Sequence, residues 1–276
     1  MRTRAAGDLW SVCRRAAPGD AVRWMTALAS HLPDCARSRC LSPADVSWER
    51  TGARFRTPSG ACVALPGSYT AGAREMYCRN VYLRTGLSMP ADGWVIDLGA
   101  NRGLFSVWAA VTGAQVVAVE AQRDFAPLIQ ALAQHNDVQN RVHVEVGMAS
   151  GVTHSGSAVG LLADDEVWAS ASHGAPARPR DLSVPELMAR YWIDQIALLK
   201  VDIEGGEFAL LAAGDDLSWL EQVNQIALEV HPDHGSPADL AESLRRHGFT
   251  VDLRDNDGLP APADSTDVSY AYGWRR

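Results

Sequence analysis

Residues 94–103, WVIDLGANRG, decide the fold of this chain. The stretch starts with apolar residues typical of a buried strand and then turns at Asp97 and Gly99. Apolar residues return at helical spacing from Leu104 to Trp108. A buried strand, a tight glycine turn and a helix, in this order, are how doubly wound α/β folds hold a nucleotide-like cofactor.

Strand and helix patterns continue to alternate along the rest of the chain. Strands are predicted at 116–119, 142–146, 196–199, 226–228, 249–253 and 268–272, and helices at 124–135, 183–191 and 237–247. Alternation of this kind predicts a doubly wound α/β fold with a mostly parallel, Rossmann-like sheet and ligands at the carboxyl ends of its strands.

Residues 1–65 are predicted to form an N-terminal extension. The α/β domain would then occupy residues 66–276. Helical spacing runs over residues 1–33 and ends at Pro33, residues 34–50 have the composition of a turn-rich connection, and residues 53–65 are typical of a hairpin. The extension is expected to pack on the core or on a second copy in a homodimer. A lid over the active site is the less favoured role. Residues 67–86 lead into the glycine turn, so some of their aromatic and charged side chains could reach the amino-acid end of a cofactor, but a surface position is the favoured expectation for each one.

Composition restricts the classes of partner. The net charge of −8 argues against nucleic acid and anionic membranes, which usually select a basic imbalance. No stretch approaches the ~20 apolar residues that a membrane helix needs. The five cysteines include no CxxC pair, so structural zinc and a disulfide framework are poorly supported. We therefore expect a cytoplasmic protein with reduced cysteines.

The glycine turn discriminates between cofactors. A dinucleotide fingerprint needs GxGxxG so that the backbone can approach a pyrophosphate. Here Asn101 and Leu104 stand where the second and third glycines are required, which obstructs that approach. We therefore predict S-adenosylmethionine (SAM), whose amino-acid end is zwitterionic and carries no phosphate.

The predicted SAM site consists of the turn and the ends of the next two strands. Backbone amides of the turn would meet the methionine carboxylate, and Asp97 would order the loop or face the ammonium group. Glu120 would bind the ribose hydroxyls, and Met148 with its neighbours would offer an apolar edge to adenine. The full predicted set is Asp97, Gly99, Ala100, Asn101, Gly103, Glu120, Ala121, Gly147 and Met148.

Two motifs together carry a resemblance to a known family. The stretches VIDLGANRGLFS (95–106) and LKVDIEGGE (199–207) resemble those of the FkbM-like methyltransferases, and residues 229–231, EVH, are similar to the acid-x-His that ends the family's fifth strand. The resemblance spans about residues 70–232, and the second motif is the more specific. It implies a seven-stranded class I methyltransferase that uses SAM, mostly for O-methylation of natural products, sugars or related small molecules. Ala121 and Gly206 depart from the family's usual Pro and Ala.

Polar residues that follow the fourth and fifth strands are the candidate catalytic groups. Methyl transfer is an in-line displacement in which positioning dominates and a base helps when the acceptor is a hydroxyl. We predict His231 as the base, with Asp202 or Glu229 to orient it, Glu204 in the catalytic set and Glu229 also near the substrate. The alternative is a purely structural role, in which Glu204 and Glu207 cap the next helix and His231 supports the fold.

Other interpretations stay open. The trio of Asp202, Glu229 and His231 could hold a divalent metal that binds the acceptor oxygen, which is less favoured than a metal-free base. Oxygen is the expected acceptor, because residues 202–205, DIEG, replace the Asn/Asp-Pro-Pro-Tyr/Phe run of amino-group methyltransferases. A SAM-binding protein without catalysis and an NAD-dependent oxidoreductase are rival classes. Trp168, in the aperiodic loop 150–180, is a candidate lid or substrate-stacking residue, and burial against the sheet is an equal alternative.

Overall fold

A seven-stranded sheet forms the centre of the molecule. The computed structural model describes residues 2–38, 40–84, 86–150, 179–212 and 216–275. The sheet has the order β10–β11–β9–β8–β3–β4–β5. Its strands are β3 (Trp94–Leu98), β4 (Gln115–Glu120), β5 (Val142–Val146), β8 (Ile196–Val201), β9 (Gln225–Glu229), β10 (Thr250–Asp255) and β11 (Val268–Trp274). Only β11 runs antiparallel to its neighbours, so the predicted mostly parallel sheet is confirmed.

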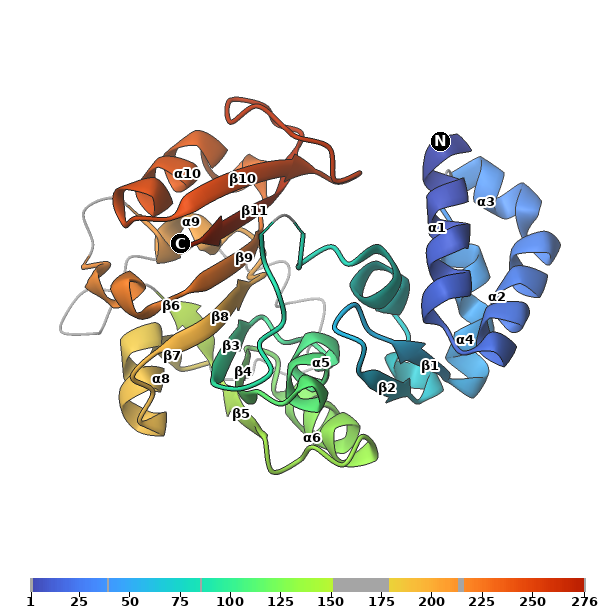
Figure 1. Ribbon diagram of the computed structural model, residues 1–276, viewed down its shortest axis with the longest axis horizontal. Helices are drawn as coiled ribbons and strands as arrows, with labels where there is room; N and C mark the ends of the chain where they lie inside the picture. Colours follow the sequence, from blue (N-terminus) through green and yellow to red (C-terminus); the bar gives the residue numbers. More distant parts are fainter. Residues whose placement is uncertain (1, 39, 85, 151–178, 213–215, 276) are drawn as a thin grey trace.

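Helices cover both faces of this sheet (Figure 1). The helices are α5 (Leu104–Thr112), α6 (Ala126–His135), α8 (Val184–Tyr191), α9 (Glu207–Leu210) and α10 (Pro237–Arg246). Successive residues of β3 belong to different hydrophobic clusters, since Val95 packs with α5 and α6 whereas Ile96 packs with α8 and α10. Alternate side chains of a strand point to opposite faces, so the two clusters are the two layers of a doubly wound fold.

Local sequence signals set the ends of several helices. Ser183 and Ser236 each precede a helix with proline in its first turn, and their Oγ atoms accept hydrogen bonds from backbone amides three residues on. A parallel pair of short strands, β6 (Met148–Ser150) and β7 (Asp181–Ser183), was not predicted. Trp168 lies outside the described residues.

Four helices and a hairpin make up the N-terminal part. They are α1 (Arg2–Arg15), α2 (Pro18–Ser30), α3 (Leu32–Ser38), α4 (Ser42–Thr51), β1 (Ala53–Arg56) and β2 (Cys62–Leu65). The hairpin is confirmed. The prediction that helical structure ends at Pro33 and gives way to a turn-rich connection is wrong. Pro33 and Pro43 both lie in the first turn of a helix, where the missing proline N–H costs no hydrogen bond.

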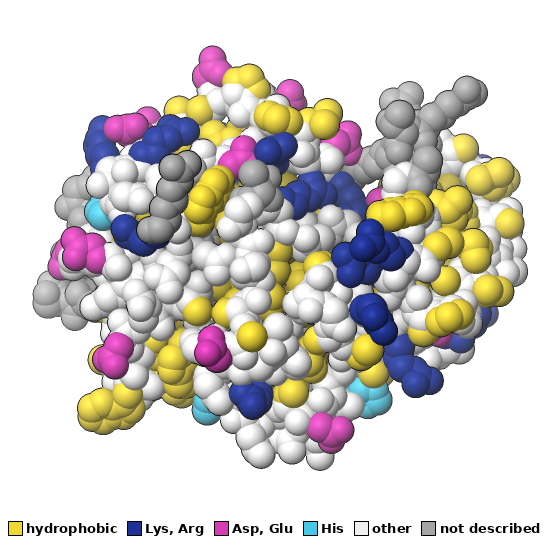
Figure 2. Space-filling model, viewed as in Figure 1, with side chains coloured by type: hydrophobic (Ala, Val, Ile, Leu, Met, Phe, Trp, Pro, Cys, Tyr) yellow, Lys and Arg dark blue, Asp and Glu magenta, His cyan; other side chains and the backbone are white. Residues whose placement is uncertain are grey.

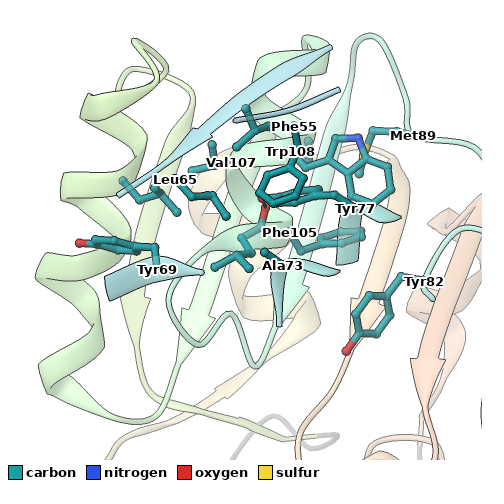
Figure 3. Packing of buried hydrophobic residues seen from close by; sticks show 14 of the residues in the cluster. Phe55, Leu65, Tyr69, Ala73, Tyr77, Tyr82, Met89, Phe105, Val107 and Trp108 are labelled. Atoms are coloured by element: carbon teal, nitrogen blue, oxygen red, sulfur yellow. Dashed lines mark hydrogen bonds between the residues drawn. The ribbon is translucent and has the colours of Figure 1, made fainter. Parts of the chain in front are cut away.

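A row of aromatic side chains joins the N-terminal part to the main domain. Trp24, Trp48, Phe55, Tyr77 and Trp108 follow one another with ring centroids 6.1, 5.0, 5.3 and 6.0 Å apart. Figure 3 shows the inner end of this row, where Phe55 and Tyr77 meet Trp108 of α5. Since all five rings lie in one buried cluster, the extension packs on the core of the main domain.

Buried ion pairs reinforce the same junction. Arg74, in the π-helical segment η2 (Arg74–Arg79), pairs with Asp8 of α1 at 3.0 Å and with Asp45 of α4 at 3.1 Å. The expectation of surface positions over residues 67–86 is therefore wrong for Arg74, and it is also wrong for Tyr69, Tyr77 and Tyr82, which are buried. The arginine is buried because two carboxylates neutralise it, and the tyrosines because they pack in the core.

The surface of the N-terminal helices is unusually apolar. Five of the seven large exposed hydrophobic residues found among those described lie there: Leu9, Trp10, Val22, Leu32 and Val46. Hydrophobic side chains are correspondingly visible over these helices in Figure 2. A homodimer through this surface stays a prediction. None of the helices in the described part of the chain is long and apolar enough to cross a membrane.

Candidate active site

The glycine turn after β3 packs directly against the end of β8. Gly99 has φ 76°, and a Cβ atom built on it would overlap the carbonyl oxygen of Asp202. Only glycine combines this backbone conformation with so close an approach. The amide of Asp202 also donates to the carbonyl of Leu98 at 3.0 Å. The two sequence motifs therefore meet in one site at the carboxyl ends of the strands.

Four backbone amides of the turn form hydrogen bonds inside the protein. Gly99 and Ala100 donate to the same β4 carbonyl oxygen at 3.0 Å, Gly103 donates to Ala100 at 2.8 Å, and Asn101 donates to the Glu120 carboxylate at 2.7 Å. These four amides are engaged by the protein itself, and the contact of the turn with the methionine carboxylate stays a prediction. These hydrogen bonds attach the turn to the end of β4 and fix its shape.

Asp97 is fully buried and orders the turn from below. Its Oδ2 accepts a hydrogen bond from Ser106 Oγ at 2.6 Å, and its Oδ1 lies 3.1 Å from the Lys200 ammonium. Lys200 also donates to the carbonyl of Gly99 at 2.7 Å and lies 3.4 Å from Asp202. Of the two predicted roles of Asp97, this geometry matches ordering of the loop.

The charge of Lys200 is held by its carboxylate neighbours. Burial alone would lower the pKa of Lys200, but the carboxylates of Asp97 and Asp202 raise it above its ordinary value. The side chain therefore stays cationic in the interior. It links the floor of the turn to the end of β8.

Glu120 joins the turn to the loop after β4. One carboxylate oxygen accepts from the amide of Asn101 and the other from the amide of Gln122, at 2.7 and 2.8 Å. Burial raises its pKa. Each oxygen keeps a second lone pair, so a contact with ribose hydroxyls remains a consistent prediction. Gly147 donates to the carbonyl of Glu120 at 3.0 Å, and half-buried Met148 follows it.

Tyr82 connects the two strand-end carboxylates. Its hydroxyl lies 2.8 Å from Asp202 Oδ2 and 2.6 Å from Glu229 Oε2. One hydroxyl proton cannot serve both acceptors, so a second proton is needed. Burial raises the pKa of Glu229 to about 7, and the neighbouring Asp202 carboxylate adds to the effect. The raised pKa of Glu229 favours its protonated form, which can donate to the Tyr82 oxygen.

His231 lies between two other carboxylates. Its Nδ1 is 3.0 Å from Glu207 Oε1, and its Nε2 is 3.4 Å from Glu204 Oε2. Hydrogen bonds to Glu204 and Glu207 raise the pKa of His231 to about 10. The Nδ1 partner is thus Glu207 and not Asp202 or Glu229, which were predicted to orient the ring. Those two carboxylates point their oxygens at Tyr82 instead.

The predicted catalytic residues come together at these strand ends. One ligand atom from each of Asp202, Glu229 and His231 lies within 4.8 Å of the others, and Glu204 pairs with His231. Sequence reasoning missed Tyr82, Lys200 and Ser106, and treated Glu207 only as a helix cap. A lysine at the end of an otherwise apolar strand was the available signal for Lys200. Nothing local distinguished Tyr82 from the other tyrosines of its segment.

A family model now accounts for the same stretch of chain. The model described as "Methyltransferase FkbM domain" matches residues 97–251, which is more than half of the chain. The chain belongs to the FkbM methyltransferase family. The resemblance drawn from the two motifs is confirmed, and the enzyme is a SAM-dependent methyltransferase of class I fold.

Two relatives illustrate how this domain occurs elsewhere. The 31-O-demethyl-FK506 methyltransferase FkbM of Streptomyces tacrolimicus is 27% identical over 235 residues, covering 71% of this chain and 88% of that protein. The AMB antimetabolite synthetase AmbE of Pseudomonas aeruginosa is 28% identical over 246 residues. That alignment covers 73% of this chain but only 11% of AmbE, so the chain corresponds to a small part of the synthetase.

Solved methyltransferase structures are similar at a lower level. The precorrin-6y C5,15-methyltransferase of Geobacter metallireducens aligns over 67% of this chain and 81% of its own, with 12% identity and a TM-score of 0.40. The METTL16 MTase domain aligns over 67% of this chain and 60% of its own, with 11% identity and a TM-score of 0.41. The class I assignment rests on the sheet order and the family match.

Proposed function

We propose that this FkbM-family enzyme transfers the methyl group of SAM to a hydroxyl oxygen of a small molecule, with His231 as the general base. The observation that carries the proposal is the position of His231, at the end of β9 beside Asp202 and Glu229. Those groups share the strand ends with the glycine turn, because Asp202 packs on Gly99. A base and the SAM-binding turn are then neighbours.

The residues at the strand ends suit SAM by charge. Five carboxyl groups, those of Asp97, Asp202, Glu204, Glu207 and Glu229, lie around Lys200 and His231, so acidic groups outnumber basic ones at these strand ends. Such an excess favours a cationic ligand. SAM, when bound, supplies a methyl group on a positively charged sulfonium centre. Free acceptor positions on Glu120 suit its ribose.

The protein's own groups would then act as follows. In the neutral form of the His231 ring, Nε2 takes the hydroxyl proton as the acceptor oxygen bonds to the methyl carbon and the carbon–sulfur bond breaks, which leaves S-adenosylhomocysteine. Nε2 becomes available when the Glu204 side chain, which is 85% exposed, moves away from the ring. Tyr82 and the two carboxylates that it joins form the adjacent wall, where they can hold the acceptor in line.

Two observations support oxygen as the acceptor. The residues after β8 are Asp202-Ile203-Glu204-Gly205, where amino-group methyltransferases place an Asn/Asp-Pro-Pro-Tyr/Phe run. The FkbM relative is named for a 31-O-demethyl substrate. A hydroxylated product of secondary metabolism is the acceptor class that we propose from this relative.

A variant of His231 tests the proposal. Turnover would be followed with isotopically labelled SAM on catechol, glucose, serine and 31-O-demethyl-FK506. The His231→Ala variant should lose turnover by about 10²–10⁴-fold, the usual contribution of a general base. Its affinity for S-adenosylhomocysteine, measured by calorimetry, should stay within about twofold. Retained turnover, or lost affinity together with turnover, would contradict the role of base.

A metal-assisted reaction is the second candidate. The specific observation in its favour is that ligand atoms of Asp202, Glu229 and His231 approach one another within 4.8 Å. A hard cation there would bind the acceptor oxygen and lower the pKa of its hydroxyl. Turnover after treatment with a chelator separates the two mechanisms: unchanged turnover removes the metal, and a loss restored by Mg²⁺ or Mn²⁺ favours it.

A further inference from the structure

Glu207 lies where the loops after β8 and β9 meet. Its side chain is fully buried. Oε1 accepts two hydrogen bonds from one residue, from the backbone amide of His231 at 2.7 Å and from its ring Nδ1 at 3.0 Å. Oε2 accepts from the amide of Gly205 at 2.9 Å. Both carboxylate oxygens are therefore committed to these two loops.

A helix-capping role explains only part of this pattern. The bond to Gly205 stabilises the backbone just before α9, which has four residues. The two bonds to His231 come from a different strand end and do nothing for that helix. They fix the backbone and the ring of one histidine to a single carboxylate oxygen. A ring held at both points has little freedom to rotate.

The contact also decides which ring nitrogen faces the site. When Nδ1 carries the proton that is donated to Glu207, Nε2 is the nitrogen left for exchange with a ligand. The Nε2 partner, Glu204, is exposed and replaceable, whereas Glu207 is enclosed. Catalytic histidines are oriented in this way, by a buried carboxylate on one nitrogen, while the other nitrogen exchanges its partner for the substrate.

We propose that Glu207 is the positioning residue of this enzyme, and that it holds His231 with Nε2 directed at the acceptor hydroxyl. The proposal rests on the function proposed above and deepens it. Glu207 acts through His231 and does not touch the acceptor. The carboxylates expected in that role, those of Asp202 and Glu229, are hydrogen bonded to Tyr82.

Nuclear magnetic resonance of histidine-¹⁵N-labelled protein with S-adenosylhomocysteine tests the geometry without an acceptor. The Nδ1 proton of His231, assigned by its absence from His231→Ala, should be downfield and protected from exchange with water. Glu207→Gln should shift or remove this resonance. Glu145→Gln, which alters a hydrogen-bonded carboxylate on β5, should leave it in place. An unprotected Nδ1 proton in the wild-type protein overturns the proposal even where Glu207→Gln does not fold.

A double-mutant cycle tests the role of Glu207 in catalysis. Turnover would be measured with whichever of the four acceptors named above gives the highest rate. Glu207→Gln should lower kcat by about tenfold or more and leave KM within about twofold. In the His231→Ala background the same change should alter kcat by less than about twofold, because residues that act as a unit are not additive. An equal loss of kcat in both backgrounds makes Glu207 merely structural and overturns the proposal. Full turnover of His231→Ala would instead remove the proposed base.

Discussion

Replacement of Lys200 by methionine should destabilise the protein by about 3–5 kcal/mol, the usual cost of removing one partner from a buried ion pair. The side chains of Lys200 and Asp97 are 3% and 0% exposed, and their charged atoms are 3.1 Å apart. Methionine fills much of the same volume, so the main loss is the cation. Asp97 would keep its hydrogen bond from Ser106 but would lie in the interior without a counter-charge.

The chain contains a matched control for this experiment. Arg246 and Glu242 also pair at 3.1 Å, but their side chains are 65% and 51% exposed. Solvent screens such a pair, so Arg246→Met should cost about 0–1 kcal/mol. Urea denaturation at pH 7 measures both changes, and the two variants differ in burial while the charge that is removed is the same.

A second substitution identifies the origin of the loss. Asp97→Asn in the Lys200→Met background removes the orphaned charge, so the double variant should be more stable than Lys200→Met alone. The reasoning is refuted if Lys200→Met costs no more than Arg246→Met, or if the added Asp97→Asn brings further destabilisation of similar size.

Three further predictions concern His231, Tyr82 and Glu120, each of which has two hydrogen-bond partners in the site. A base must be neutral, and bonds to Glu204 and Glu207 raise the pKa of His231 to about 10, so kcat/KM should rise with pH up to about 10. Glu204→Gln should move this rise to lower pH. A pH profile identical to that of the wild-type enzyme would contradict the role of Glu204 in raising the pKa. Tyr82→Phe keeps the ring but removes the hydroxyl that lies between two carboxyl groups, so kcat should fall by about 10–100-fold with unchanged affinity for S-adenosylhomocysteine. The reverse pattern would be inconsistent with the geometry. Glu120→Gln removes the carboxylate that accepts a hydrogen bond from the amide of Asn101 in the turn. Calorimetry should then show S-adenosylhomocysteine binding about 10–100-fold weaker. Undiminished binding would exclude Glu120 from the site.

The fold could be predicted because its signals are local. A buried run such as residues 94–98 marks a strand wherever it occurs, and Ser236 followed by Pro237 marks a helix start. The error at residues 34–50 has a local cause as well. Proline can end one helix or begin the next, and composition alone does not distinguish these positions for Pro33 and Pro43.

The candidate site was predicted only in outline because its pairings are not local. The strand ends that carry Asp202 and His231 follow from the topology of a parallel sheet. Glu207 and not Glu229 is the partner of His231 Nδ1, and this pairing depends on how the loops after β8 and β9 pack against each other. Tyr82 reaches the site from a segment 120 residues before Asp202. No periodicity encodes such a contact.

The identity of the atom that receives the methyl group tests the central claim most directly. The enzyme would be incubated with methyl-¹³C SAM and the panel of hydroxylated acceptors, and the labelled carbon of each product would be located by nuclear magnetic resonance. We expect a ¹³C-methoxy signal from the wild-type enzyme that the His231→Ala variant does not produce. Label found only on nitrogen or carbon, or a methoxy product formed equally well by His231→Ala, would contradict it.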